Sequence, residues 1–179
     1  MFINNFTIFE ANSILMKKST VFKTLVDILF VLHFIGLFFP FIAIPFGTIT
    51  LLEVNIKLED WTVFYVLIGL YGLVGYIIFL RGLYYLRKMA NSLVKTNCFS
   101  DQIIANLKNA GNNFLITGIM FFVSFAILWL YKLYNGKIEF IYDNLMIPIF
   151  LSIIGLFFII QSNTLLLAKN INDENELTV

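Results

Sequence analysis

Four long apolar stretches run along this chain, separated by more polar segments. They cover residues 25–47, 61–80, 114–131 and 145–167. A helix rises 1.5 Å per residue, so roughly 20 residues cross the hydrocarbon core of a bilayer, which is about 30 Å thick. The stretches are close to this length. We therefore predict an all-α integral membrane protein with four transmembrane helices, arranged as two hairpins in one domain, residues 20–168.

Residues 81–113 form the polar connection between the second and third stretches. Leu86, Met89 and Leu93 keep an apolar face at i, i+3 and i+7 within it. This spacing predicts that the second helix continues beyond the membrane, with its polar side turned to water. We expect it to end near Asn97.

A second helix start follows at Ser100. Serine is a favourable N-cap residue, and Asp101 suits the positive end of a helix dipole. Ile103, Ile104 and Leu107 then give one apolar side. The pattern predicts a short cytoplasmic interfacial helix that lies at the membrane surface and leads into the third span.

The two outer loops contain alternating apolar and polar residues. Residues 53–58 have a period of two, which is typical of a strand, and residues 137–142 follow the turn dipeptide Asn135-Gly136. A strand needs a partner for its backbone groups. We therefore expect residues 53–58 and 137–142 to pair as a small extracytoplasmic antiparallel sheet.

Small residues recur within three of the predicted spans, where they let neighbouring helices approach closely. The three sets are Gly69, Gly72 and Gly75; Ala110, Thr117 and Ser124; and Pro148, Gly155 and Ser162. The second and third sets have a spacing of seven, which is expected on the buried seam of a left-handed helix pair.

The positive charges gather on one side of this arrangement. Nine of the twelve Lys and Arg residues fall on the side of the termini and the 81–113 connection: Lys17, Lys18, Lys23, Arg81, Arg87, Lys88, Lys95, Lys108 and Lys169. The other three lie in the outer loops: Lys57, Lys132 and Lys137. Because short cytoplasmic loops accumulate Lys and Arg, we expect both termini in the cytoplasm.

Composition agrees with a membrane protein and argues against direct nucleic-acid binding. The chain is 60% apolar and 13% charged, whereas a soluble domain carries roughly 25% charged residues. Its 12 cations and 11 anions leave a net charge of +1, so no basic field points to nucleic acid. The partner that composition does indicate is the lipid bilayer.

The two ends of the chain are more polar than the spans. Residues 1–19 contain no basic region followed by a small-residue cleavage site, so we expect a cytoplasmic extension and not a secretory signal. Met16 precedes two lysines and resembles a translation start, so an extension and a start-codon artefact both stay open. Residues 169–179 form an acidic cytoplasmic tail.

Three polar residues within the spans are candidates for function: Asp27, His33 and Gln161. Ionisable groups inside a membrane are functional candidates by default. Each also has a structural interpretation, which we favour. Asp27 has Lys23 at i−4 as an ion-pair partner, neutral His33 has hydroxyls on other helices within reach as hydrogen-bond partners, and Gln161 can hold helices together.

No catalytic, cofactor or metal site is predicted. The single cysteine, Cys98, excludes an internal disulfide, and with the single histidine it leaves only carboxylates to complete a zinc site. No nucleophile with its base, phosphate loop or HExxH motif occurs. Three of the four spans also lack the charged groups expected of a transporter. We therefore expect a non-enzymatic role in sensing, scaffolding or regulation.

Two motifs resemble a known bacterial family. The C-terminal residues 174–179 read E-N-E-L-T-V and are similar to a terminal E-N-[DE]-L-T-V signature. Residues 97–101 with Gly111 resemble the N-P-F-[ST]-x element between that family's second and third spans, although Cys98 stands where the family usually has proline. The family is the domain of unknown function numbered 2975, a four-span membrane family, and the resemblance covers residues 16–179.

The resemblance implies a location in the bacterial inner membrane and a partner. Members of this family are commonly encoded beside a small helix-turn-helix transcription regulator, so we expect a membrane-anchored partner of such a protein. An accessory or structural subunit of a membrane complex or transporter is the alternative. The candidate contact residues lie in the tail: Asp173, Glu174, Glu176, Leu177 and Val179. A solvated, disordered tail stays open as a second interpretation.

The charge asymmetry predicts that Cys98 faces the cytoplasm. A membrane-impermeant maleimide should leave Cys98 unlabelled in intact cells and label it once the membrane is opened. A Lys137→Cys variant in a Cys98→Ala background is the control, because it should be labelled in both states. Labelling of Cys98 in sealed cells would overturn the predicted topology.

Overall fold

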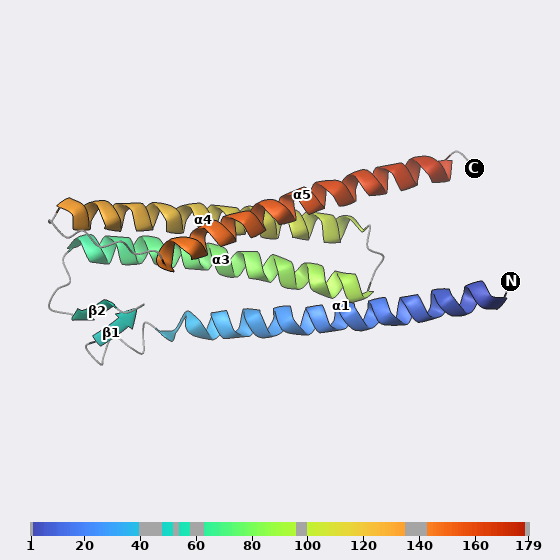
Figure 1. Cartoon of the computed structure of the whole chain (residues 1–179), viewed down its shortest axis with the longest axis horizontal. Helices are drawn as coiled ribbons and strands as arrows, with labels where there is room; N and C mark the ends of the chain where they lie inside the picture. The colour runs from blue at the N-terminus through green and yellow to red at the C-terminus, as the bar shows by residue number, and fades with distance from the viewer. Residues whose placement is uncertain are drawn as a thin grey trace.

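The described part of the protein contains four long helices and one short strand pair (Figure 1). The computed structural model describes residues 2–39, 48–51, 54–57, 63–95, 100–134 and 143–177. The helices are α1 (Phe2–Gly36), α3 (Val63–Lys95), α4 (Asp101–Tyr134) and α5 (Asp143–Leu177), and the strands are β1 (Thr48–Leu51) and β2 (Val54–Lys57). Each helix includes a segment long and apolar enough to cross a membrane, which confirms the prediction of a multi-pass membrane protein.

The helices are longer than a bilayer requires. α3, α4 and α5 have 33, 34 and 35 residues, so each is about 50 Å long at 1.5 Å per residue. About 20 Å of each helix therefore extends beyond a hydrocarbon core of about 30 Å. Both termini lie at the same end of the bundle (Figure 1).

α4 begins where the sequence predicts a helix start but has no break after it. The carbonyl oxygen of Ser100 accepts hydrogen bonds from the N–H groups of Ile103 and Ile104 at 3.0 and 3.2 Å, as expected for an N-cap residue. The helix then continues to Tyr134. The predicted interfacial helix is therefore not a separate element, and its residues form the first turns of α4.

α1 differs from the predicted first span at both ends. It begins at Phe2, so the expected N-terminal extension is helical, and it ends at Gly36 before the prolines that follow. The N–H of Leu37 still donates to the carbonyl oxygen of His33 at 3.1 Å. The rest of the predicted span, residues 40–47, lies outside the described residues.

The two described strands form a local hairpin that was not predicted. β2 lies within the predicted strand 53–58, but it pairs antiparallel with β1, and Leu51 lies opposite Val54. The other predicted segment, residues 137–142, lies outside the described residues. A hairpin with two residues between its strands loses less entropy on closure than a pairing between distant segments, which explains this choice of partner.

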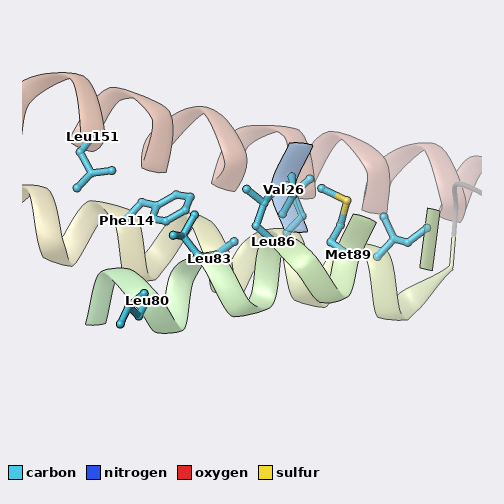
Figure 2. Packing of buried hydrophobic residues seen from close by; sticks show 10 residues of the cluster. Val26, Leu80, Leu83, Leu86, Met89, Phe114 and Leu151 are labelled. Carbon is cyan, nitrogen blue, oxygen red and sulfur yellow. The ribbon is translucent and has the colours of Figure 1, made fainter. Parts of the chain in front are cut away.

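The core lies where α3, α4 and α5 meet, with Val26 of α1 at its edge (Figure 2). Phe114 of α4 is 3% exposed, and its ring centroid lies 5.6 Å from that of Phe79 on α3 and 5.9 Å from that of Phe158 on α5. The other buried apolar residues of these three helices are Leu80, Leu83, Leu86, Met89, Ala90, Ile103, Ile104, Leu107, Ala110 and Leu151.

Most of this core belongs to the polar connection predicted at residues 81–113. The apolar face of Leu86 and Met89 packs against α4 and α5 and is buried, as are Ile103 and Leu107. The i, i+3, i+7 pattern therefore marks a packed helical core that extends past the apolar stretches. Hydropathy alone does not distinguish such a face from one that lies on a lipid surface.

α4 and α5 approach each other through small residues. A Cβ atom added to Gly111 would lie 2.7 Å from the carbonyl oxygen of Gly155, and one added to Gly118 would lie 2.8 Å from that of Pro148. The Ser162 hydroxyl donates to the carbonyl oxygen of Ile104 at 2.9 Å and so links the two helices. Pro148, Gly155 and Ser162 are all buried, as their spacing of seven predicts.

The glycines of α3 behave differently from the prediction. Of Gly69, Gly72 and Gly75, only Gly75 is close to a neighbouring helix, since an added Cβ would lie 2.9 Å from Cε1 of Phe121. Added Cβ atoms at Gly69 and Gly72 would meet nothing within 4 Å. Residues three apart drift around a helix with 3.6 residues per turn, so only one of the three faces α4.

Alanine substitution of a glycine in the α4–α5 contact should destabilise the protein. Gly111→Ala forces backbone atoms of the two helices apart, and we expect the free energy of unfolding to fall by about 1–3 kcal/mol, as for other overpacked sites. Unfolding in mixed micelles, followed by circular dichroism, measures this change. Gly72→Ala is the matched control and should be neutral or slightly stabilising. Equal effects of the two substitutions would contradict the proposed role of the close contact.

Candidate functional site

An ion pair joins α1 to α3 at Asp27, the first of the predicted polar candidates. Arg87 Nε donates to Asp27 Oδ1 at 2.6 Å, and the two side chains are 41% and 30% exposed, respectively. The guanidinium carbon of Arg87 also lies 5.3 Å from the ring centroid of Phe30. A charge-assisted hydrogen bond and a cation–π contact thus hold one side chain. The structure pairs Asp27 with Arg87 and not with Lys23.

His33 packs against α3 six residues closer to the end of α1, which is almost two helical turns. Its Nδ1 lies 2.8 Å from the carbonyl oxygen of Leu29, which accepts the hydrogen bond. The ring centroid is 5.1 Å from that of Phe79 in an edge-on arrangement. The Tyr76 hydroxyl donates to the backbone carbonyl of His33 at 2.8 Å, so it does not bind the imidazole. The structure does not bring Asp27 and His33 together.

Gln161 lies on the surface of α5 with its side chain exposed. The neighbouring Ser162 makes the bond between helices that was expected of Gln161, because the Ser162 hydroxyl donates to Ile104 on α4. A shift of one residue turns a side chain by 100° around a helix. The sequence therefore indicates the depth of this polar contact but not the residue that makes it.

A second ion pair joins α5 to the start of α4. Lys169 Nζ donates to both carboxylate oxygens of Asp101 at 2.7 Å. Lys169 lies past the apolar stretch that ends at residue 167, and its hydrogen bond to Asp101 raises the pKa of the lysine. We did not predict this pair. Lys169 is the first charge after the fourth apolar stretch, but Asp101 lies 13 residues before the third stretch, with Lys108 between them. Their positions in the sequence therefore give no signal for this pair.

The acidic tail is the end of a helix. α5 continues to Leu177, and the side chains of Asp173, Glu174 and Glu176 are exposed. Asn172 Nδ2 donates to Glu176 Oε1 at 3.0 Å. In Figure 1 this end of α5 projects beyond the start of α4. Val179 and the Leu177 side chain, the apolar contact residues predicted here, lie outside the described part.

Metal-ligating side chains do not cluster in the described part of the chain, where no group of three or more His, Cys, Asp and Glu residues is close enough to hold a metal ion. The contacts of Asp27 and His33 connect α1 to α3, and that of Lys169 connects α5 to α4. The polar groups of the bundle are therefore used to join helices.

Comparison with known proteins gives one match. A family model described as "Protein of unknown function (DUF2975)" matches residues 23–179. Neither a curated protein nor a solved structure matches the chain.

The Asp27–Arg87 pair should stabilise the packing of α1 on α3. In a double-mutant cycle with Asp27→Asn and Arg87→Gln, we expect a coupling energy of about 1 kcal/mol in the free energy of unfolding, because the pair is charge-assisted but partly exposed. Unfolding of the four proteins in mixed micelles provides the measurement. Arg87→Lys keeps the charge and serves as control, and it should lose the contact with Phe30. A coupling energy near zero would show that the pair does not hold α1.

Proposed function

This chain belongs to the DUF2975 family, and we propose that it is a membrane-anchored, non-enzymatic partner of a small cytoplasmic helix-turn-helix transcription regulator. One observation carries the proposal. The acidic end of α5 is an exposed helix that projects from the end of the bundle where both termini lie (Figure 1). The proposed location is the bacterial inner membrane, with this end of the bundle in the cytoplasm.

The charge of this helix end suits a DNA-binding protein. A helix-turn-helix surface is cationic because it neutralises phosphates. Asp173, Glu174 and Glu176 offer three exposed carboxylates within four residues of one helix. The closest preceding cation, Lys169, is hydrogen-bonded to Asp101 on α4. Its ammonium group is therefore held toward α4 rather than toward the end of the tail.

Binding at this surface would compete with DNA. A regulator that uses the same cationic residues for carboxylates and for phosphates cannot contact both at once, so the membrane protein would withhold it from its operator. The basic side of α3, with Arg81 and Lys88 exposed, would repel the same cationic surface. This repulsion would direct the regulator to the tip of α5.

The contacts inside the bundle support a non-enzymatic role. Asp27 is engaged by Arg87, and His33 packs between its own helix and the rings of α3. These ionisable groups stabilise helix packing, which is a sufficient role for each. The alternative function, an accessory or structural subunit of a membrane complex or transporter, would use the lipid-facing sides of the spans and leave the tail without a role.

Neutralising the tail should release the regulator. In a variant with Asp173→Asn, Glu174→Gln and Glu176→Gln, we expect capture of the helix-turn-helix protein encoded beside this gene to weaken at least about tenfold, since each charge across such an interface contributes on the order of 1 kcal/mol. Pull-down from solubilised membranes at several salt concentrations, together with transcription of the regulator's target, provides the measurement.

The control neutralises cations at the same end of the bundle. Lys95→Gln with Lys108→Gln should capture the regulator at least as well as the unmodified protein does. All variants must reach the membrane in equal amounts. Unchanged capture and transcription in the tail variant would exclude the tail as the contact and favour the role of an accessory subunit.

A further inference from the structure

One exposed face of α3 changes character along its length. Its residues follow one another at intervals of three and four, which keeps them on one side of the helix. The outer part is apolar and exposed: Leu67, Leu70, Val74 and Ile77. The inner part carries Arg81, Tyr84 and Lys88, which are also exposed. We call these seven residues the α3 stripe.

The two cations of the stripe converge on a pair of tyrosines. The guanidinium carbon of Arg81 lies 5.8 Å from the ring centroid of Tyr85, one turn further along the helix. Nζ of Lys88 lies 6.0 Å from the ring centroid of Tyr84, one turn back. The two rings are 5.9 Å apart. Arg81 and Lys88 therefore reach toward each other from opposite directions.

Both cations of the stripe therefore lie beside the tyrosine pair. In the part of the chain that the structure describes, neither Arg81 nor Lys88 forms an ion pair, whereas Arg87 beside them is paired with Asp27. Tyr84, between the two cations, is 47% exposed. Two converging cations and a phenolic hydroxyl are suitable donors for a phosphate oxygen.

We propose that the α3 stripe binds an anionic phospholipid, with its phosphate at Arg81, Tyr84 and Lys88 and an acyl chain along Ile77, Val74 and Leu70. Along α3 the apolar residues of the stripe are followed by its cations, in the same order as the acyl chain and the phosphate group of such a lipid. From residue 67 to residue 77 the apolar part extends about 15 Å along the helix, at 1.5 Å per residue. A free phosphate would use only the cationic part.

The position of the stripe agrees with a lipid site. Tyrosine favours the level of the head groups, and basic side chains at the end of a span attract anionic lipid. Arg81 directly follows the predicted second span, which ends at residue 80, so its charge lies at that level. The proposal needs only this interface and is independent of the function proposed for the tail.

Removing both cations should weaken lipid binding. The full-length protein in a neutral detergent is titrated with phosphatidylglycerol or phosphatidylcholine, and bound lipid is counted by native mass spectrometry. We expect phosphatidylglycerol to bind selectively, and Arg81→Gln with Lys88→Gln to bind it about 30-fold less tightly, at about fivefold for each cation. Arg81→Lys with Lys88→Arg should retain binding.

Two further variants distinguish a specific lipid-binding site from nonspecific electrostatic attraction between the protein and anionic lipid. Lys23→Gln with Lys108→Gln removes two cations from α1 and α4 and should leave binding unchanged. Tyr84→Glu keeps both cations but places a carboxylate between them, and it should lose binding. Far-UV circular dichroism verifies that each variant is folded.

Several outcomes would overturn the proposal. Equal binding of the two lipids, or equal losses in the Lys23/Lys108 and Arg81/Lys88 variants, would show diffuse attraction only. Displacement of the lipid by glycerol phosphate at the same concentration would show that the apolar part contributes nothing. Stronger competition by an acidic peptide with the sequence of residues 171–179 would assign the stripe to a protein partner.

Discussion

Lipid tails are as apolar as leucine, so the hydrophobic effect that packs soluble helices is weak between helices inside a bilayer. Association there depends on close backbone contact and on hydrogen bonds between helices. The α4–α5 pair meets this constraint. Gly111 faces Gly155 without any side chain between them, and Ser162 bonds to Ile104. With these two helices held together, α3 packs mainly against α4, and Phe114 of α4 lies between Phe79 of α3 and Phe158 of α5.

α1 is held in a different way, since it packs on α3 alone among the strongly contacting helices. Its inward residues are few: Val26 in the core and the aromatic side chains of Phe30 and His33 beside α3. Such a narrow contact gains little from close packing. The Asp27–Arg87 pair and the cation–π contact with Phe30 therefore contribute a larger part of the stability with which α1 is attached. In the α4–α5 pair, polar contacts contribute a smaller part.

Sequence patterns predicted the elements of this fold better than the contacts between them. Hydropathy located the four spans, capping preferences located the start of α4, and the spacing of seven located Gly155 and Ser162. Periodicity shows which residues share a face, but it does not name the opposite element, so the partner of Asp27 was predicted wrongly and β1 was not anticipated as a partner of β2. Hydropathy also cannot reveal that Leu86 and Ile103 pack into a core between helices, because an apolar face looks the same against protein and lipid.

The two charged surfaces at this end of the bundle lie on different helices. Arg81 directly follows the apolar span of α3, whereas Asp173, Glu174 and Glu176 lie six to nine residues beyond residue 167 of α5, or about 9–14 Å at 1.5 Å per residue. The negative potential of a cytoplasmic leaflet decays over a Debye length of about 8 Å. In the proposed orientation, Arg81 therefore meets lipid phosphates while the carboxylates escape most of the repulsion from them. The Lys169–Asp101 pair holds α5 against α4 just before the carboxylates, so in this orientation the acidic helix end would point into the cytoplasm.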